Sequence, residues 1–193
     1  MRIYRLFPKK AVIFMSSNTS APVISTPRLC FCALFAALAC AGTFIAVPLP
    51  IGYFNLGDIF VLCAAWCLGP VPGALAAGLG SALADIIMGY VLYAPATFLI
   101  KGCTALLAGA LFRALFSALK TAFPARLLSA VVGEAVMVGG YFVFEAVFMG
   151  YGMGASVSVP GNLLQAACGV CGAVMLISVL QANRTLRRYL TLN

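Results

Sequence analysis

The chain has 193 residues, of which 64% are hydrophobic and 8% are charged, and its formal net charge is +8. Soluble domains carry about 25% charged residues, so this composition excludes an ordinary water-soluble fold and indicates an integral membrane protein. Histidine is absent and no GxxxxGK[ST] phosphate loop occurs, which excludes histidine-dependent catalysis and a P-loop ATPase within this chain.

Residues 1–28 differ from the rest of the chain. Cations cluster near the start, and the polar stretch SSNTSAPVISTP follows them. The apolar piece AVIF is too short for a signal-peptide core, which needs about 7–15 apolar residues. We therefore expect a cytoplasmic tail, with Met1 and Met15 both open as the start residue.

Six hydrophobic segments follow, separated by Pro, Gly or charged residues. The second has about 14 residues, or roughly 21 Å of helix, and is expected to cross only part of the bilayer. The sequence predicts an all-α membrane protein with a six-transmembrane-helix bundle over 29–183 and a basic cytoplasmic tail over 184–193. The six segments are 29–47, 57–70, 73–92, 95–116, 126–149 and 161–183.

The cations are distributed unevenly between the two sides of this bundle. With the amino terminus in the cytoplasm, eleven of the twelve Lys and Arg residues fall on the cytoplasmic side. The external connections PLPIGYFN, YVLYAP and MGYGMGASVSVPG carry no cation, as the positive-inside rule predicts. We expect both termini to be cytoplasmic, and the net charge to reflect membrane orientation rather than nucleic-acid binding.

One lysine and all four acids of the chain lie in or at the rim of hydrophobic segments. A charge at the bilayer centre costs about 2.5–3.5 kcal/mol even on insertion scales, so such residues usually face the bundle interior and mark a substrate or ion path. The five residues are Asp58, Asp85, Lys101, Glu134 and Glu145.

Counted from the external side, Asp58 starts the second segment, Lys101 lies about six residues into the fourth, and Asp85 lies about seven residues from the outer end of the third. These depths are compatible with pairing, and for Lys101 and Asp85 the sequence leaves the role open. Two readings remain open. They form a buried structural ion pair, or one or both contact a substrate. In either case we expect acidic groups on neighbouring helices to neutralise Lys101.

The fifth segment, GEAVMVGGYFVFEA, carries Glu134, Met137, Tyr141 and Glu145 at spacings of three, four and four. These spacings place them on one helical face. Ordinary packing explains the Met and the Tyr, but two glutamates on the same face favour a polar cavity. We expect Tyr141 and Glu145 to contact a ligand, with Glu134 deeper toward the cytoplasm.

Further candidates lie toward the external side. Asn162 and Gln165, one turn apart, either cap and cross-link helices or read the donors and acceptors of a neutral heterocycle. The loop PLPIGYFNLGD is either a simple turn or a lid that covers an apolar ring with Tyr53 and Phe54. Tyr93 is a further candidate in the connection YVLYAP.

The first segment, CALFAALACAG, repeats alanine every fourth residue at Ala33, Ala37 and Ala41. Small residues at this spacing allow close helix approach, either within the bundle or against another membrane protein. Cys168 and Cys171 form a CxxC pair, which we interpret as small apolar packing in a membrane helix.

The order NLGD, LGPVPGALAAGLGSALADIIMGYVLYAPATFLIKG, GEAVMVGGYFVFEA and PGNLLQ resembles the S components of energy-coupling factor (ECF) transporters, especially the riboflavin-type group. The resemblance covers about residues 29–183. It implies a vitamin-capture protein without enzyme activity or cofactor, which binds its ligand near the external side and topples in the membrane to release it. The polar positions that it matches are Asn55, Asp58, Lys101, Glu134, Tyr141, Glu145, Asn162 and Gln165.

The resemblance also implies a partner. Ala33 and Ala37 match a docking motif for a transmembrane coupling subunit that works with two ATPase subunits. Rival interpretations are a stand-alone secondary transporter, for which no convincing inverted repeat is found, an intramembrane enzyme built on Asp58 and Asp85, and a structural subunit. The substrate stays open between riboflavin, a pyridoxine-type vitamin, a thiamine-precursor pyrimidine and a queuosine precursor.

Overall fold

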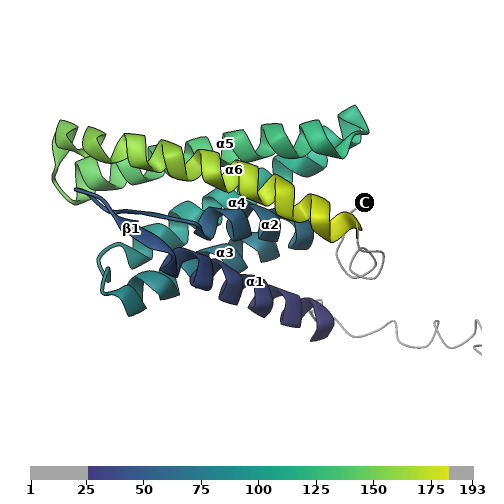
Figure 1. Ribbon diagram of the computed structural model, residues 1–193, viewed down its shortest axis with the longest axis horizontal. Helices are drawn as coiled ribbons and strands as arrows, with labels where there is room; N and C mark the ends of the chain where they lie inside the picture. The colour runs from purple at the N-terminus through teal and green to yellow at the C-terminus, as the bar shows by residue number, and fades with distance from the viewer. Residues whose placement is uncertain (1–25, 183–193) are drawn as a thin grey trace, which may run out of the picture.

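The computed structural model describes residues 26–182, which form a bundle of six helices with a small β-hairpin at one end (Figure 1). Five of these helices are long and apolar enough to cross a membrane, and the sixth is shorter. The predicted six-helix bundle is therefore confirmed. The expected N-terminal tail up to residue 25 and the tail 184–193 lie outside the described residues.

The helices match the six predicted segments in order, with boundaries shifted by a few residues. A π-helical stretch, Phe144–Phe148, continues α5, and a 3-10 stretch, Gly152–Ser158, leads into α6. The elements are α1 (Thr26–Phe44), β1 (Ala46–Pro48), β2 (Tyr53–Asn55), α2 (Gly57–Leu68), α3 (Pro70–Met88), α4 (Ala94–Leu119), α5 (Ala122–Val143) and α6 (Val159–Ala182).

Two predicted boundaries are wrong. The first segment was expected to stay helical to residue 47, but Ala46 and Val47 belong to β1. The third was expected to reach residue 92, but α3 ends at Met88 because Gly89 follows with φ of 88°. This left-handed conformation is costly for residues with a Cβ and is a common helix terminator.

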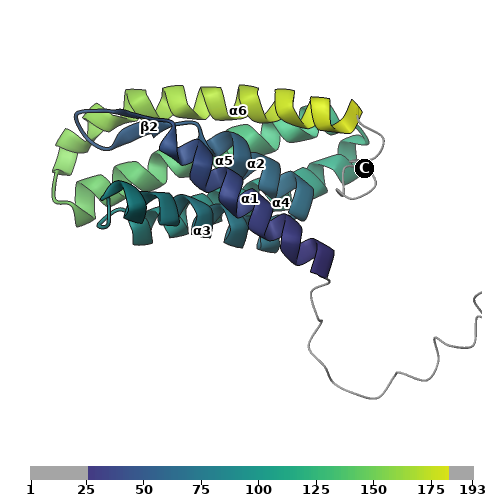
Figure 2. The same cartoon turned by 60° about the horizontal axis from the view of Figure 1, so that its bottom comes forward.

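The chain crosses the bundle an even number of times. The start of α1 and the end of α6 lie at the same end in both ribbon views, at the right of Figures 1 and 2. The hairpin, the α3–α4 turn and the α5–α6 connection lie at the opposite end. This end, called the hairpin end below, is where the polar residues converge.

Helix α2 forms the centre of the bundle. It packs against α1, α3, α4 and α6, and ten of its twelve residues are buried. At about 18 Å it is shorter than the hydrocarbon core of a bilayer, which is about 30 Å thick. Neighbouring helices rather than lipid surround it, which explains why its sequence has no polar face.

Close packing of α1 on α3 depends on small residues. A Cβ added at Gly80 would lie 3.0 Å from Ala36 Cα and closer still to the carbonyl group of Ala36. Because that obstacle is backbone, it cannot rotate away. Gly80 thus allows the two helices to approach closely, as small residues do in membrane bundles.

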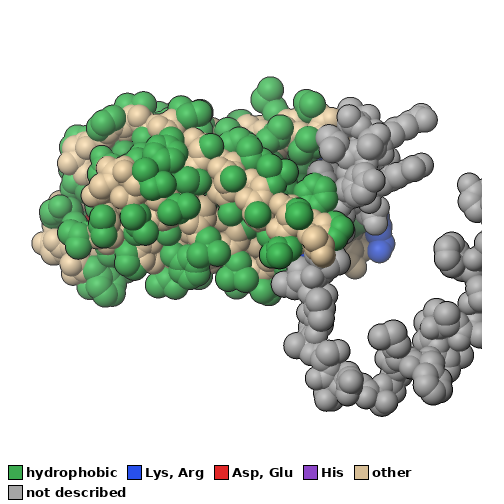
Figure 3. Space-filling model, turned by 90° about the horizontal axis from the view of Figure 1, so that it is seen from below, with side chains coloured by type: hydrophobic (Ala, Val, Ile, Leu, Met, Phe, Trp, Pro, Cys, Tyr) green, Lys and Arg blue, Asp and Glu red, His purple; other side chains and the backbone are tan. Residues whose placement is uncertain are grey.

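The surface of the bundle is apolar and its interior holds the charges. Figure 3 shows hydrophobic side chains along the whole visible face, with Lys or Arg only at the end near the chain termini. Leu79, Leu83 and Ile87 of α3 are among the large exposed apolar residues, whereas all four carboxylates are buried. This arrangement suits a protein surrounded by lipid.

Candidate functional site

The β-hairpin carries two polar side chains over the hairpin end. Strands β1 and β2 are antiparallel, with Val47 paired to Phe54 and Ala46 to Asn55. Gly52, at φ of 69°, supplies the left-handed conformation that the turn requires. The expected external loop is thus an ordered hairpin, and the alternation along β2 turns Tyr53 and Asn55 to the same face.

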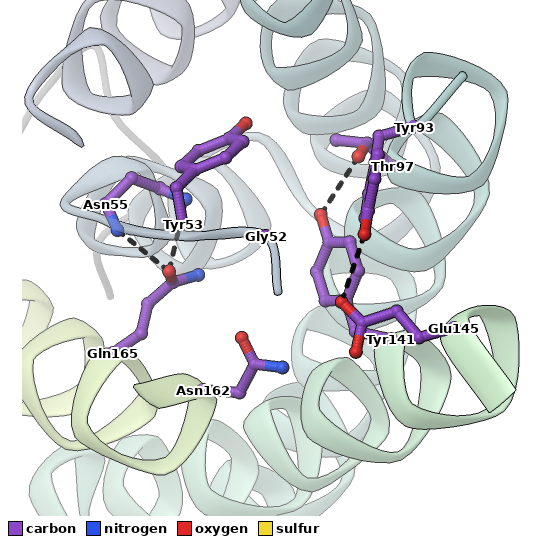
Figure 4. Close-up of a pocket in the computed structure, with 9 residues that line it drawn as sticks. All are labelled: Gly52, Tyr53, Asn55, Tyr93, Thr97, Tyr141, Glu145, Asn162 and Gln165. Carbon is purple, nitrogen blue, oxygen red and sulfur yellow. Dashed lines mark hydrogen bonds between the residues drawn. The ribbon is translucent and has the colours of Figure 1, made fainter. Parts of the chain in front are cut away.

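A pocket lies beneath this hairpin, between β2, α4, the end of α5 and the start of α6 (Figure 4). The lining side chains nearly close it and leave a cavity of about 20 Å³. Aromatic, amide, hydroxyl and carboxylate groups meet in it. The lining residues are Gly52, Tyr53, Asn55, Tyr93, Thr97, Tyr141, Glu145, Asn162 and Gln165.

One wall of the pocket joins α4 to the end of α5. Thr97 Oγ1 and the Tyr141 hydroxyl share a hydrogen bond of 3.0 Å. Glu145 accepts a hydrogen bond from Ser158 and a longer one, 3.5 Å, from Tyr93. Burial, followed by the charge of Glu145, raises the pKa of Tyr93, so its hydroxyl stays protonated and can donate.

Glu145 lies in the π-helical stretch rather than in regular α-helix. Such stretches are rare in proteins, but those that occur are often found at functional sites. Glu145 is 2% exposed and points toward the pocket in Figure 4. The predicted common face of the fifth segment is confirmed, since Glu134, Met137, Tyr141 and Glu145 are all buried.

The floor of the pocket is a chain of hydrogen bonds across four elements. Lys101 of α4 donates to Asp58 Oδ1 of α2 over 2.5 Å, and Asp58 Oδ2 accepts from Gln165 Nε2 of α6 over 2.6 Å. Gln165 Oε1 then accepts from the Asn55 backbone N–H and Nδ2 over 2.8 Å and 3.1 Å. Lys101 is thereby connected to the hairpin.

Lys101 is neutralised by a carboxylate, as expected, but of the two open readings the ion pair with Asp85 is wrong. The ion pair forms with Asp58, whereas Asp85 accepts a hydrogen bond from the Tyr53 hydroxyl. Lys101 is 1% exposed, and its ammonium lies 5.4 Å from the centre of the Tyr141 ring. Ion pair and ring together replace the water that the ammonium loses on burial.

Tyr53 closes the opposite wall. Its hydroxyl donates to Asp85, and its ring lies 4.8 Å from the ring of Tyr90, centre to centre. Burial, followed by the charge of Asp85, raises the pKa of Tyr53. The hairpin is therefore fastened to the bundle at two points, by Tyr53 to α3 and by Asn55 to α6.

Glu134 lies deeper and differs from the other three acids. It is 2% exposed, and neither of its oxygens has a hydrogen-bond partner among the described residues. A Cβ added at Gly169 of α6 would lie 2.8 Å from Asp58 Cβ and 3.2 Å from Glu134 Oε1, so this glycine makes room for both acids.

Most of the predicted site residues meet at this pocket. Seven line it, namely Tyr53, Asn55, Tyr93, Tyr141, Glu145, Asn162 and Gln165. Asp58, Asp85, Lys101 and Glu134 do not line it and lie behind the lining residues. Whether each of these residues contacts a ligand stays a prediction.

Sequence reasoning missed Gly52, Thr97 and Ser158. Thr97 precedes Lys101 by four residues and therefore shares its helical face, a signal that the spacing carried. Ser158 had no such signal, because it reaches Glu145 only through the fold of the α5–α6 connection. No group of three or more metal-ligating side chains occurs within residues 26–182, and no disulfide forms among the eight cysteines, which all fall in that range.

The alanine-rich face of α1 is open. Ala33, Ala37 and Ala41 are exposed, while Ala36 packs on Gly80 of α3. Packing within the bundle therefore uses a different face of α1 from the one that carries the predicted docking residues.

Comparison with known proteins identifies the family. Residues 23–182 match the family described as "ECF-type riboflavin transporter, S component". The chain is also 39% identical over 126 residues to a protein of Pyrococcus woesei described as "Uncharacterized protein in gap 3'region", an alignment that covers 65% of this chain and 80% of that protein. The chain therefore belongs to the riboflavin-type S components, the multi-pass membrane subunits that bind substrate for ECF transporters and are not enzymes.

Proposed function

We propose that this S component captures a vitamin or vitamin precursor with an aromatic ring in the pocket beneath the hairpin, and that an ATPase-driven coupling module completes its uptake. The observation that carries the proposal is the pocket itself. Three tyrosines, three amides, a threonine and a carboxylate converge inside an otherwise apolar bundle. Burying polar groups costs free energy unless they are hydrogen-bonded, and a few convergent polar groups in a cavity are typical of a binding site.

The chemistry of the lining suits a planar heterocycle. Tyr53, Tyr93 and Tyr141 offer ring surfaces as well as hydroxyls. Asn162 Nδ2 is buried and has no hydrogen-bond partner among the described residues. An unsatisfied buried donor costs about 1–3 kcal/mol, so an acceptor on the ligand would recover that energy.

The distribution of cations supports an external location for the pocket. Arg28 bonds the carbonyl of Leu68 at the end of α2, and Arg113 packs against Gly69. Both lie at the end opposite the hairpin, where Lys120 at the end of α4 and Arg126 near the start of α5 also fall. The positive-inside rule assigns this end to the cytoplasm, and with it both termini.

ATP-driven uptake requires a partner, because the chain contains no P-loop ATPase motif. The exposed Ala33, Ala37 and Ala41 form a flat strip on α1 that suits a helix of another membrane protein. We propose that the transmembrane coupling subunit, which works with two ATPase subunits, docks on this strip. It is called the alanine strip below. An S component that topples in the membrane would release the ligand inward.

Reconstitution in liposomes tests the proposal. The full chain is inserted with and without the coupling module, and uptake of labelled riboflavin, a pyridoxine-type vitamin, a thiamine-precursor pyrimidine and a queuosine precursor is measured. We expect uptake of one of these compounds only with the coupling module and ATP. Equal uptake by the chain alone, driven by an ion gradient, would establish the alternative, a stand-alone secondary transporter.

A further inference from the structure

The pocket also indicates the charge of its ligand, an inference that rests on the proposed function. We propose that the ligand is a small heterocycle that carries a protonated amine or an amino-substituted, protonatable ring, bound by Glu145. Neutral flavins and phosphorylated vitamins are then poor ligands. Three observations support this assignment, from charge, geometry and hydrogen bonding.

The first is the charge balance around the pocket. Four carboxylates are buried in the bundle, and Lys101 is the one cation among the described residues that lies near the pocket. Lys101 forms an ion pair with Asp58 at 2.5 Å, and Gln165 lies between this pair and the pocket. The remaining described cations lie toward the cytoplasmic end. No described cation therefore lies free beside the carboxylate that lines the pocket.

The second is the position of Glu145. It is the one carboxylate that lines the pocket, and it is almost fully buried. Ser158 donates to Oε2, while Oε1 has only the long 3.5 Å contact from Tyr93 and faces Gly52 of the hairpin turn. A buried carboxylate without a cation is costly. An ammonium at Oε1 would supply both the counter-charge and a charge-assisted hydrogen bond.

The third is the amide of Asn162, on the other side of the cavity in Figure 4. Asn162 is 7% exposed, and its unpartnered Nδ2 can donate to a ring nitrogen or a hydroxyl oxygen. The pocket thus presents a charged acceptor on one side and a donor on the other. An aromatic ring with an amino substituent and a second, accepting heteroatom matches both.

The same charges disfavour a phosphate ester. It would add negative charge beside Glu145, and none of the residues that line the pocket is a cation that could receive it.

Matched ligand pairs test the inference on the purified full chain in detergent. Pyridoxamine is compared with pyridoxine, and 4-amino-5-hydroxymethyl-2-methylpyrimidine with its 4-hydroxy analogue, by isothermal titration calorimetry at neutral pH. Riboflavin and pyridoxamine phosphate complete the panel. We expect the amine of at least one pair to bind about tenfold or more tightly than its partner, and the phosphate ester to bind more weakly than the free amine.

Glu145→Gln should bring the affinity ratio of that pair close to one, while Glu145→Asp, which keeps the charge, should retain a preference for the amine. Thermal unfolding of each variant separates loss of binding from loss of fold. If riboflavin or a neutral alcohol binds as tightly as the amines, the inference is overturned and the proposed function stands. If no compound of the panel binds, both are overturned.

Discussion

Lys101 Nζ lies 2.5 Å from Asp58 Oδ1, and the second oxygen of that carboxylate holds the Gln165 amide that binds the hairpin at Asn55. The lysine therefore acts on the pocket through two other side chains rather than by lining it. Its charge fixes Asp58, and Asp58 fixes which way the Gln165 amide faces. A single buried cation thus helps to set the shape of a site that it does not touch.

Removing this cation should loosen the hairpin. Lys101→Met keeps the volume but leaves Asp58 buried without a counter-charge, and breaking a buried pair in this way costs about 3–5 kcal/mol. We expect a lower melting temperature and at least tenfold weaker ligand binding. Both are measured in detergent, by thermal unfolding and calorimetry.

The double variant Lys101→Met with Asp58→Asn is the control for that experiment. It removes both charges and keeps an acceptor for Gln165, so most of the lost thermal stability should return. If Lys101→Met alone leaves both the melting temperature and the affinity unchanged, the pair has no such role.

Gly80→Ala tests the packing of α1 on α3. The added Cβ would clash with the backbone of Ala36, and overpacking of this kind costs about 1–3 kcal/mol. Gly139→Ala on α5 is the matched control, because nothing lies within 4 Å of the added carbon there. We expect Gly80→Ala to lower the melting temperature and Gly139→Ala to leave it unchanged. Equal behaviour of the two would show that the close approach of α1 and α3 contributes little.

The raised pKa of Tyr53 predicts a pH dependence of stability. Burial and the charge of Asp85 favour the protonated phenol in the folded state, so its pKa is higher there than the ordinary value of about 10. The stability that the protonated Tyr53 gives to the folded state is fully present below about pH 10 and is lost as the pH rises above that value. We expect the melting temperature to fall less steeply above pH 10 in Tyr53→Phe than in the unmodified protein.

Tyr151→Phe, which changes an exposed tyrosine, provides the comparison. Its melting curves should follow those of the unmodified protein across the same pH range. A Tyr53→Phe variant with the same pH profile as the unmodified protein would contradict the assignment.

The alanine strip predicts a separation between ligand binding and docking. Replacing Ala33 and Ala37 by Trp adds bulk to an exposed face that is far from the pocket lining. We expect the double variant to bind ligand with unchanged affinity but to lose co-purification with the coupling module. Ala114→Trp, on an exposed position of α4, should keep both properties. Retained co-purification of the Ala33 and Ala37 variant would place the coupling subunit on another face.

Much of the fold was predictable because it depends on the lengths of the hydrophobic segments and on the Pro, Gly and charged residues that separate them. The hairpin was not predicted, since strands of three residues leave almost no periodic signal and Pro48 and Pro50 read simply as a loop. Asp58 was expected at the start of the second segment, among the charges that face the bundle interior, and it is completely buried.

The same reasoning explains the wrong partner of Lys101. Counting residues from the end of a segment gives the depth of a side chain but not the direction in which its helix presents it. Asp85 lies on α3 toward Tyr53, whereas the central helix α2 presents Asp58 to α4 and α6. The common face of Glu134, Met137, Tyr141 and Glu145 was predictable, because spacing within one helix fixes relative direction.

The central claim is that the pocket beneath the hairpin holds one small heterocycle, and native mass spectrometry tests it most directly. The purified full chain is incubated with the vitamin panel and compared with Asn162→Trp, which fills the pocket from α6. We predict one bound molecule per chain in the unmodified protein and none in the variant at a similar melting temperature. The absence of any bound compound, or equal retention of the same compound by Asn162→Trp, would contradict the claim.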